Sequence, residues 1–518
     1  MIKRYFATKD NTITNAFQEN LITRGTGSNM GASDVLEVFS IRGQASSGSS
    51  ELSRVLIQFD TDDIASDRTS GDLPASGSVR FYLKMYNAPH SKTTPRDYKI
   101  CVFAASASWE EGVGLDMEEY SDLTDDEIGC NWIRKSGSAS WAVPGGTVHT
   151  GSVSEETFVT GLEDLEVDVT DHVERWLKGM HTNAGFHVRL SSSYEAQFSG
   201  SQAFQNTKTS AQNSGFSGSV LINMNGSTRS YYTKRFFGRN SEFHFKRPTL
   251  EARFDDAKTD DRGNFYFSSS LAPTDQNKNT LYLYNYVRGR LRDIPVVNQG
   301  NIYVRLFSGS SAPTGNPIRQ TFGSLNSLYA TGSHVSTGIY SCDVCITGNA
   351  STLSKVFDVW SNNPAGTTQY FTGSITTKDF SSQGFRSAKK YVLSMPNLGE
   401  NYKKGDVAFM RLYVREKNWS PNIFTVASAT RIPSVLIESA SFQLKRCIDG
   451  HPVIPYGTGS LKHTGLSYDV TGNYFKLDTS YLESGYQYEI CYSFYNEDSN
   501  SYVEQPYKFK FRVTDNEY

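Results

Sequence analysis

Six cysteines and nine histidines are the side chains best suited to bind a metal or carry redox chemistry. Cys342 and Cys345 form a C-x-x-C motif inside IYSCDVCI, a segment whose composition and pattern predict a β-strand. Residues three apart in a strand point to opposite faces, so these two thiols do not share one face. The histidines are dispersed and form no H-E-x-x-H motif. We therefore expect free thiols, no metal and no cofactor.

Paired carboxylates would suit a glycosidase, which needs two acids about 5 to 9 Å apart. Glu110 and Glu111, next to Trp109, are the candidates, but adjacent strand residues face opposite ways. The sequence also has no G-x-S-x-G nucleophile motif, no P-loop and no dinucleotide-binding fingerprint. These observations predict a protein that is not an enzyme.

Two acidic segments contain hard oxygen ligands of the kind that bind calcium. The candidate ligands are Asp60, Asp62 and Asp63 in one segment, and Asp122, Asp125, Asp126 and Glu127 in the other. Neither segment has the EF-hand spacing, and acidic surface loops are usually only solvated. We expect no bound cation at either.

Aromatic side chains offer a different chemistry, because sugar rings stack on Trp and Tyr while nearby polar groups bind the hydroxyls. Trp132, Trp141, Tyr231 and Tyr232 lie in loop-like contexts and are the candidate glycan-binding residues. The competing interpretation is that they belong to the core. With 13% aromatic residues, most rings in a set of sandwiches must be buried.

Strands that alternate apolar and polar residues must position these side chains. The alternation is clearest at residues 507–513, 79–86 and 486–494, and Gly-, Ser-, Asn- and Asp-rich turns separate such segments. One short helix is predicted around residues 173–178, capped by Thr170 or Asp171 and ended by Gly179. The pattern predicts an all-β fold of tandem β-sandwiches.

The length of 518 residues predicts three or four domains, and we place boundaries at 1–256, 257–379 and 380–518, the last as one sandwich or two small modules. Lys and Arg (51) nearly balance Asp and Glu (54), which argues against a nucleic-acid partner. No apolar run is long enough to cross a membrane, and the first residues lack the apolar stretch of an export signal. We expect a soluble, unexported protein.

Seven segments in the first half occur in a specific order. They are ATKDNTI, SRVLIQFDTDDI, VRFYLKMYNA, KICVFAASASWEEG, WAVPGG, LEVDVTDHVERWLKGMHTNAGFHVRL and FFGRNSEFHFKRPTLEARF. In this order they resemble the DNRLRE-type domain, a carbohydrate-binding-module-like jelly-roll sandwich. The resemblance implies that Trp109 covers the mouth of the sandwich and that Gly112 turns the chain at a structural corner.

Three later segments resemble virion structural proteins of contractile-tailed phages that infect marine cyanobacteria. They are TGIYSCDVCITGNASTLSKVFDVWSN, YKKGDVAFMRLYVREKNWSPNIFTVA and LSYDVTGNYFKLDTSYLESGYQYEI. The resemblance implies Ig- or fibronectin-like sandwiches in a structural component of the virion, assembled in the host cytoplasm in multiple copies against other virion proteins. The alternative is a protein that binds a cell-surface or extracellular polysaccharide.

Overall fold

The structure is a computed structural model, and its description covers most of the chain. The described residues are 1–16, 25, 27–42, 50–90, 94–115, 128–195, 231–269, 272–273, 277–322, 325–346, 353–378, 389–417, 419, 423, 434–457, 461–496 and 499–515. Among these residues, no helix combines the length and the apolar character needed to span a bilayer.

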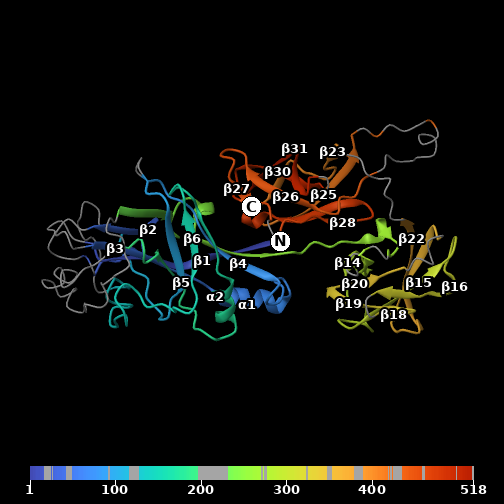
Figure 1. The fold of residues 1–518 in the computed structure, drawn as a ribbon, viewed down its shortest axis with the longest axis horizontal. Coiled ribbons are helices and arrows are strands. Elements are labelled where there is room, and N and C mark those ends of the chain that lie inside the picture. Colours follow the sequence, from blue (N-terminus) through green and yellow to red (C-terminus); the bar gives the residue numbers. More distant parts are fainter. Residues whose placement is uncertain are drawn as a thin grey trace. The chain divides into compact units, whose positions relative to one another are not determined.

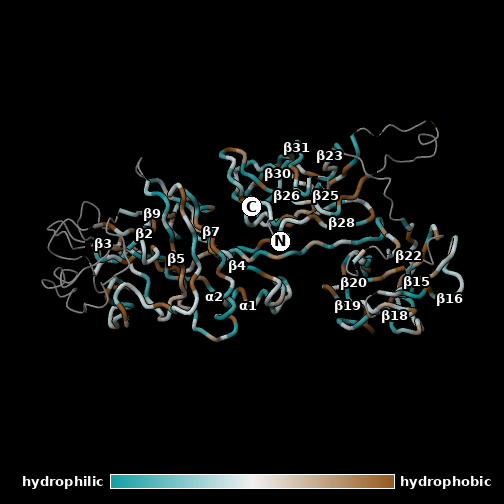
Figure 2. Tube along the Cα trace, in the orientation of Figure 1, coloured by the Kyte–Doolittle hydropathy of each residue, from teal (hydrophilic) through white to brown (hydrophobic). Residues whose placement is uncertain are grey.

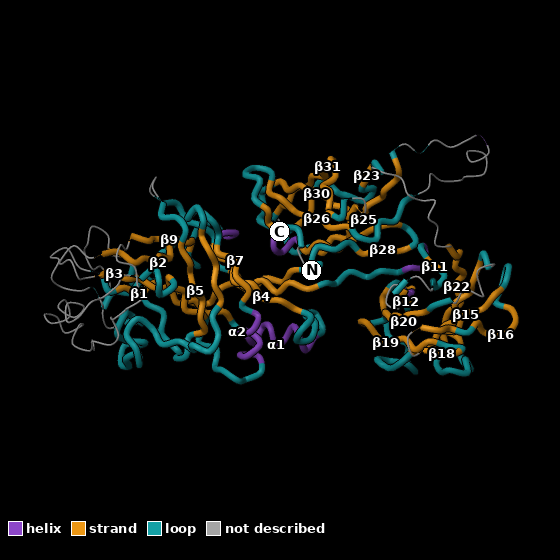
Figure 3. The backbone as a smooth tube through the Cα atoms, viewed as in Figure 1, coloured by secondary structure: helices purple, strands orange, loops and turns teal. Residues whose placement is uncertain are grey.

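The chain forms two compact units, Ile2–Phe254 and, together with Met1, Asp255–Tyr518. Both consist of mainly antiparallel sheets with apolar residues between them (Figures 1 and 3). The predicted all-β fold of tandem β-sandwiches is confirmed. In Figure 2, apolar and polar stretches alternate along the strands of both units.

The strands of the first unit form one continuous sheet system that folds into layers. Their bounds are β1 (Ile2–Thr14), β2 (Val35–Arg42), β3 (Ser50–Phe59), β4 (Val79–Met85), β5 (Tyr98–Ala104), β6 (Ser154–Phe158), β7 (Leu165–Asp168), β8 (Phe186–Leu190), β9 (Tyr231–Phe237) and β10 (Thr249–Phe254). The order is β6-β5-β8-β3-β1-β10-β4-β7, and β2 joins β3 to β9.

Strand β1 belongs to both layers of the first unit. Its first part pairs with β10, from Ile2 opposite Arg253 to Phe6 opposite Thr249. Its second part pairs with β3, after a register shift between Ala7 and Lys9. A shift of this kind bends a strand and increases its twist, which lets one strand close two sheets into a sandwich. The first and last strands of the unit are therefore direct neighbours.

The first unit contains two α-helices among its described residues, α1 (Thr61–Ser70) and α2 (Thr170–Leu177). Helix α2 lies at the predicted place and ends before Gly179 as predicted, but Val169 occupies its N-cap position without a side-chain hydrogen bond, so the predicted N-cap residues are wrong. The Thr170 hydroxyl instead accepts a hydrogen bond from the Phe81 backbone N–H at 2.9 Å. Helix α1 was not predicted at all.

The second unit contains three larger sheets. Its strands are β11 (Phe265–Tyr266), β12 (Asn279–Tyr284), β13 (Tyr286–Val287), β14 (Arg290–Leu291), β15 (Ile302–Ser308), β16 (Thr314–Ile318), β17 (Gln320–Phe322), β18 (Leu325–Ser327), β19 (Ala330–Ser336), β20 (Ile339–Val344), β21 (Lys355–Ser361), β22 (Gln369–Lys378), β23 (Tyr391–Ser394), β24 (Asn401–Lys403), β25 (Val407–Glu416), β26 (Ala440–Arg446), β27 (Pro452–Ile454), β28 (Ser467–Asp469), β29 (Gly472–Asp478), β30 (Gln487–Asn496) and β31 (Ser501–Thr514). Short 3-10 helices are η4 (His244–Lys246) in the first unit, and η5 (Asp261–Gly263) and η9 (Thr479–Tyr481) in the second.

The sheets of the second unit separate along the sequence. One sheet, β11-β22-β21-β15-β19-β20-β12 with β16 beside β15, uses strands from residues 265–378. A four-stranded sheet, β23-β25-β29-β28, and a five-stranded sheet, β24-β31-β30-β26-β27, use strands from residues 391–514. The alternation in β15 is regular, because Ile302, Val304 and Leu306 are buried while the residues between them are half-buried.

Candidate functional site

The two candidate tryptophans lie in the core of the first unit. The side chains of Trp132 and Trp141 are 1% and 5% exposed and pack in an apolar cluster with Trp109. The Trp141 indole N–H donates to the Asn131 carbonyl at 2.9 Å, and the Arg54 guanidinium lies 5.0 Å from the Trp132 ring centroid. Neither indole presents a face to a sugar, so their assignment as glycan-binding residues is wrong. The loop-like segment that carries them folds back over the sheet.

The neighbouring carboxylates make structural hydrogen bonds. Glu111 accepts the Asp10 backbone N–H and the Arg239 guanidinium, each at 2.9 Å, whereas Glu110 accepts the Gly137 backbone N–H at 3.2 Å. A Cβ at Gly112 would lie 1.9 Å from the Asn29 side-chain oxygen, so only glycine fits there. Burial raises the pKa of Asp10 to about 6, against the opposing effect of Arg239.

The first acidic segment has a local structural role. The Asp60 carboxylate caps helix α1 by accepting the Asp62 backbone N–H at 2.9 Å, and Asp62 and Asp63 occupy the first turn. Acidic residues are favourable there because they complement the helix dipole. The second segment, residues 122–127, lies outside the described residues. Within the described part of the chain, no group of three His, Cys, Asp or Glu side chains is placed to hold a metal ion.

The cysteines are free thiols, and all but the half-buried Cys447 are buried. The Cys345 thiol donates to the Thr321 carbonyl at 3.0 Å. Burial raises the pKa of Cys345 to about 11 and raises that of Cys342 further. Protonated thiols at these positions are poor nucleophiles at neutral pH.

The two candidate tyrosines do come together at the start of β9. Tyr231 is 60% exposed and stacks on Tyr232, with ring centroids 5.1 Å apart and an angle of 21° between the planes. Tyr194 meets Tyr232 edge-on at 5.2 Å, and the buried Tyr98 lies 5.6 Å away on another side. We call these four residues the tyrosine cluster. It offers an exposed ring face at Tyr231.

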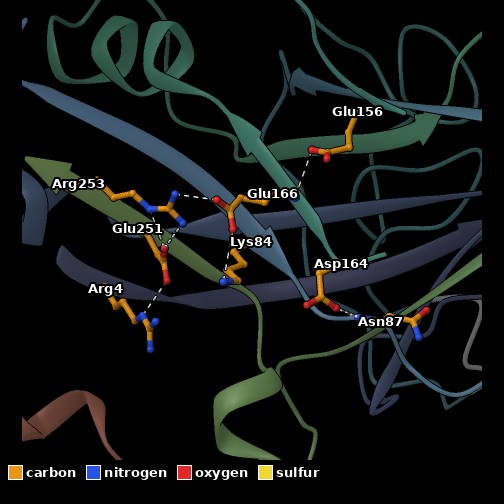
Figure 4. A network of polar contacts seen from close by, with 8 residues as sticks. All are labelled: Arg4, Lys84, Asn87, Glu156, Asp164, Glu166, Glu251 and Arg253. Atoms are coloured by element: carbon orange, nitrogen blue, oxygen red, sulfur yellow. Dashed lines mark hydrogen bonds and ion pairs between the residues drawn. The ribbon is translucent and has the colours of Figure 1, made fainter. Parts of the chain in front are cut away.

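A second polar arrangement crosses the strands β1, β10, β4 and β7 (Figure 4). Arg4 lies opposite Glu251 in the register of β1 and β10, and Lys84 lies opposite Glu166 in that of β4 and β7. We call Arg4, Lys84, Glu166, Glu251 and Arg253 the ionic ladder. Five charged side chains on one sheet face make a continuous network.

The Glu251 carboxylate is the centre of the ionic ladder. It is fully buried, and it accepts from Arg4 at 2.8 Å and from Arg253 at 2.6 Å. Arg253 also binds Glu166 at 2.7 Å, and the Lys84 ammonium lies 3.4 Å from the same carboxylate.

The electrostatic balance keeps Glu251 ionised. Burial alone would raise its pKa, but Arg4, Lys84 and Arg253 lower it to about 2. At the edge of the ladder, burial, together with the charges of Glu166 and Glu163, raises the pKa of Glu156 to about 7. The ladder therefore joins four strands by charge-assisted hydrogen bonds and ion pairs, and all of its members except the partly exposed Glu166 are shielded from water.

Sequence periodicity identified the strands of the ladder but not its burial. Residues 79–83 alternate between buried and more exposed side chains, but the predicted alternation does not continue at Lys84 and Tyr86. Instead Tyr86 packs 5.2 Å from the Lys84 ammonium, and Tyr82 packs 4.4 Å from the Arg253 guanidinium. A signal was present in the arginines and acids that recur at alternate positions of RPTLEARF.

No family model and no curated protein matches the chain. Among solved structures, fibronectin(III)-like modules of Clostridium thermocellum CbhA align with 50% of this chain and 92% of their own, at 9% identity and a TM-score of 0.14. A marsupial T cell receptor aligns with 49% of this chain and 71% of its own, at 10% identity and a TM-score of 0.16. A DUF4785 family protein from Legionella pneumophila aligns with 99% and 90%, at 7% identity and a TM-score of 0.13. Likenesses this distant carry no argument about function.

Proposed function

We propose that this protein is a non-catalytic structural component of a tailed-phage virion, at the tail, baseplate or neck, and that it binds neighbouring virion proteins. The observation that carries the assembly role is an exposed apolar patch at the end of the hairpin of β30 and β31. The assignment to a virion rests on the resemblance of the three later sequence segments to virion structural proteins of contractile-tailed phages. Other particle proteins, in multiple copies, are the proposed partners.

The patch consists of Tyr495, Tyr502 and Val503, which are 38%, 48% and 44% exposed. Tyr495 and Tyr502 are opposite each other in the register, and their rings meet at 5.4 Å. The Tyr502 hydroxyl lies 2.8 Å from the Ser439 hydroxyl, which fixes its ring against β26. Tyrosine is enriched at the centres of protein interfaces, because its ring buries much area at a small entropy cost.

The edge of β31 is protected against strand addition. On the edge of β31 that faces away from β30, strand β24 pairs with Arg512–Thr514, and the described residues place no strand beside the rest of that edge, residues 501–511. Pro506 lacks a backbone N–H, a register shift occurs between Cys491 and Ser493 on the partner strand, and Lys508 is charged. Proline, bulges and lysine are the usual devices that prevent edge-to-edge pairing. The hairpin therefore offers side chains, rather than its backbone, to a partner.

The test replaces the three patch residues together, Tyr495→Ser, Tyr502→Ser and Val503→Ser, and measures copy number in purified particles by quantitative mass spectrometry. We expect a fall of about tenfold or more, since truncation of interface anchors typically costs at least 1.4 kcal/mol. The matched control replaces Tyr286, Val287 and Val296 of the same unit, which are 61%, 45% and 76% exposed. Wild-type incorporation of the patch variant would contradict the contact, and absence of the wild-type protein from particles would contradict the virion assignment.

A second function, binding of a host-surface glycan, is favoured by the tyrosine cluster. The stacked Tyr231 and Tyr232 supply an exposed ring face of the kind on which sugar rings stack. Tyr231→Ala should abolish retention on a polysaccharide column, whereas Tyr286→Ala, an equally exposed tyrosine, should not. No retention of the wild-type chain on host polysaccharide would exclude this function.

A further inference from the structure

A buried lysine of the first unit has an unusual set of neighbours. Lys234, on the inner face of β9, is 0% exposed. Its ammonium donates to the Asn87 side-chain oxygen at 2.6 Å, to the Glu163 carbonyl at 2.7 Å and to the Gly161 carbonyl at 3.0 Å. The rings of Phe158 and Phe236 lie 5.0 and 5.3 Å from the nitrogen. An amine and a carboxamide are thus held together in an apolar enclosure.

The enclosure makes the amine a better nucleophile. Burial lowers the pKa of Lys234 to about 8, and the charges of Asp164 and Glu163 oppose this only in part. Desolvated lysines with lowered pKa values are the ones that act as nucleophiles, because a larger fraction of the amine is neutral. A usable fraction of Lys234 is therefore unprotonated at neutral pH.

The residue that supplies the carboxamide, Asn87, is held in place through its backbone. The Asn87 backbone N–H donates to the Asp164 carboxylate at 2.8 Å, as Figure 4 shows. Asn87 also bridges to Phe236 of β9, two residues from Lys234. These contacts fix the backbone of Asn87 beside β9, and the hydrogen bond from Lys234 holds its side-chain oxygen 2.6 Å from the amine, so little freedom remains to be lost on reaction.

We propose that Lys234 and Asn87 join in an intramolecular isopeptide bond. The neutral lysine nitrogen attacks the Asn87 carboxamide carbon, the bond from that carbon to Nδ2 breaks, and Nδ2 leaves as ammonia with a proton from the lysine. In sum, one alkylammonium and one carboxamide give one secondary amide and one ammonium ion. The reaction needs no oxidant, reductant or further reactant.

The competing interpretation is that Lys234 only caps three carbonyl oxygens, as a buried structural cation. Its three hydrogen bonds use all three N–H donors of the ammonium group, so the observed geometry is compatible with that role. The two interpretations differ in covalent mass. They also differ in mechanics, because a bond between residues 147 apart would close a large loop that includes β5 to β8. Such a link restricts the unfolded chain as a disulfide does, without requiring an oxidising compartment.

The test is the intact mass of the denatured full-length protein. The isopeptide bond predicts a mass below the sequence value by one ammonia, about 17 Da, and a branched tryptic peptide that contains both residues. A wild-type mass equal to the sequence value, after prolonged incubation of the folded protein near pH 8, would overturn the proposal. This measurement needs no variant to fold.

Variants make the assignment specific. Lys234→Met should restore the full sequence mass, whereas Lys246→Met, a lysine that also packs against rings, should keep the ammonia loss. Asn87→Asp should lose one water, about 18 Da, in place of ammonia, because the leaving group changes with the acyl donor. Ammonia loss that persists in Lys234→Met would place the reaction elsewhere and contradict the proposal.

Discussion

The two units of the chain stabilise their strands in different ways. In the first unit, β10 is buried on both faces, and one of those faces carries Glu251 and Arg253 of the ionic ladder. In the second unit, the cluster around Trp360 and Tyr340 is apolar, and its main buried ion pair joins Arg262 to Asp358 at 2.7 Å. A shift that separates the charges of the ladder would leave them buried without partners, a cost that an apolar cluster does not have. The first unit is therefore expected to be the less adaptable of the two.

The largest effect should follow from removing the centre of the ionic ladder. Glu251→Gln leaves Arg4, Lys84 and Arg253 with excess buried positive charge, and breaking buried pairs typically costs about 3 to 5 kcal/mol. Hydrogen exchange in urea, followed by mass spectrometry, should show the loss in peptides of residues 2–254 only. Equal protection in the variant and the wild type would contradict the role of the ladder.

A smaller effect is expected from the matching change in the second unit. Asp358 accepts two hydrogen bonds from Arg262 and one from the Trp360 indole N–H, each at 2.7 Å. Asp358→Asn keeps the shape but removes the charge that Arg262 faces, at a cost of about 2 to 3 kcal/mol. In the same hydrogen-exchange experiment, protection of the backbone amides should fall in peptides of residues 265–378. A loss larger than that of Glu251→Gln would reverse the comparison between the units.

The pH dependence of the first unit provides a third test. Burial raises the pKa of Asp10 to about 6, so the folded state binds this proton more tightly than the unfolded state. Stability from this group is therefore greatest at low pH and falls as the pH rises from about 4 to 6, by about 2 kcal/mol. Asp10→Asn should flatten this part of the curve of unfolding free energy against pH.

The matched control for Asp10 lies in the second unit. Burial also raises the pKa of Asp261 to about 6, with the Thr280 backbone N–H and the Tyr468 hydroxyl opposing the shift. Asp261→Asn should flatten the pH dependence in peptides of residues 255–515 and leave the first unit unchanged. An effect of Asp10→Asn in the second unit would show that the two units do not respond separately.

The smallest effect concerns the two helices of the first unit. Asp60→Ala removes the N-cap hydrogen bond of α1 and should cost about 1 kcal/mol. Val169→Ala at the N-cap of α2 removes no such bond, so its cost should come only from lost apolar packing. Hydrogen-exchange rates of the backbone amides in the first turn of each helix distinguish the two variants. The capping argument would be contradicted if Val169→Ala made exchange in α2 faster while Asp60→Ala left exchange in α1 unchanged.

Local patterns were sufficient to predict the strands and the fold class. The alternation in β15, β25 and β31 has a period of two residues, and it appears in their burial. Helix α1 was missed although Asp60 and the acids after it are a standard helix start, because the segment follows directly on a strong strand.

The interior chemistry could not be predicted from local patterns. Alternation indicates which side chains share a face, but not whether that face is buried, as it is at Lys84. Trp132 and Trp141 lie in a segment without periodicity that packs over the sheet. Lys234 and Asn87 are 147 residues apart, so only the pairing of β9 near the end of β4 brings them together.

The pairing of β1 with β10 has a consequence for biosynthesis. Residues 2–6 find their partners only at residues 249–253, so the first unit cannot close until the ribosome has passed that point. At cellular translation rates this leaves residues 2–6 without their partner strand for roughly 10 to 50 s, whereas the second part of β1 can pair with β3 much earlier. Contacts so distant in sequence also fold slowly. The nascent chain therefore carries Arg4 without its buried carboxylate partner and Ile2 without its cover until β10 emerges, and chaperones that bind extended segments are expected to associate with it during that time.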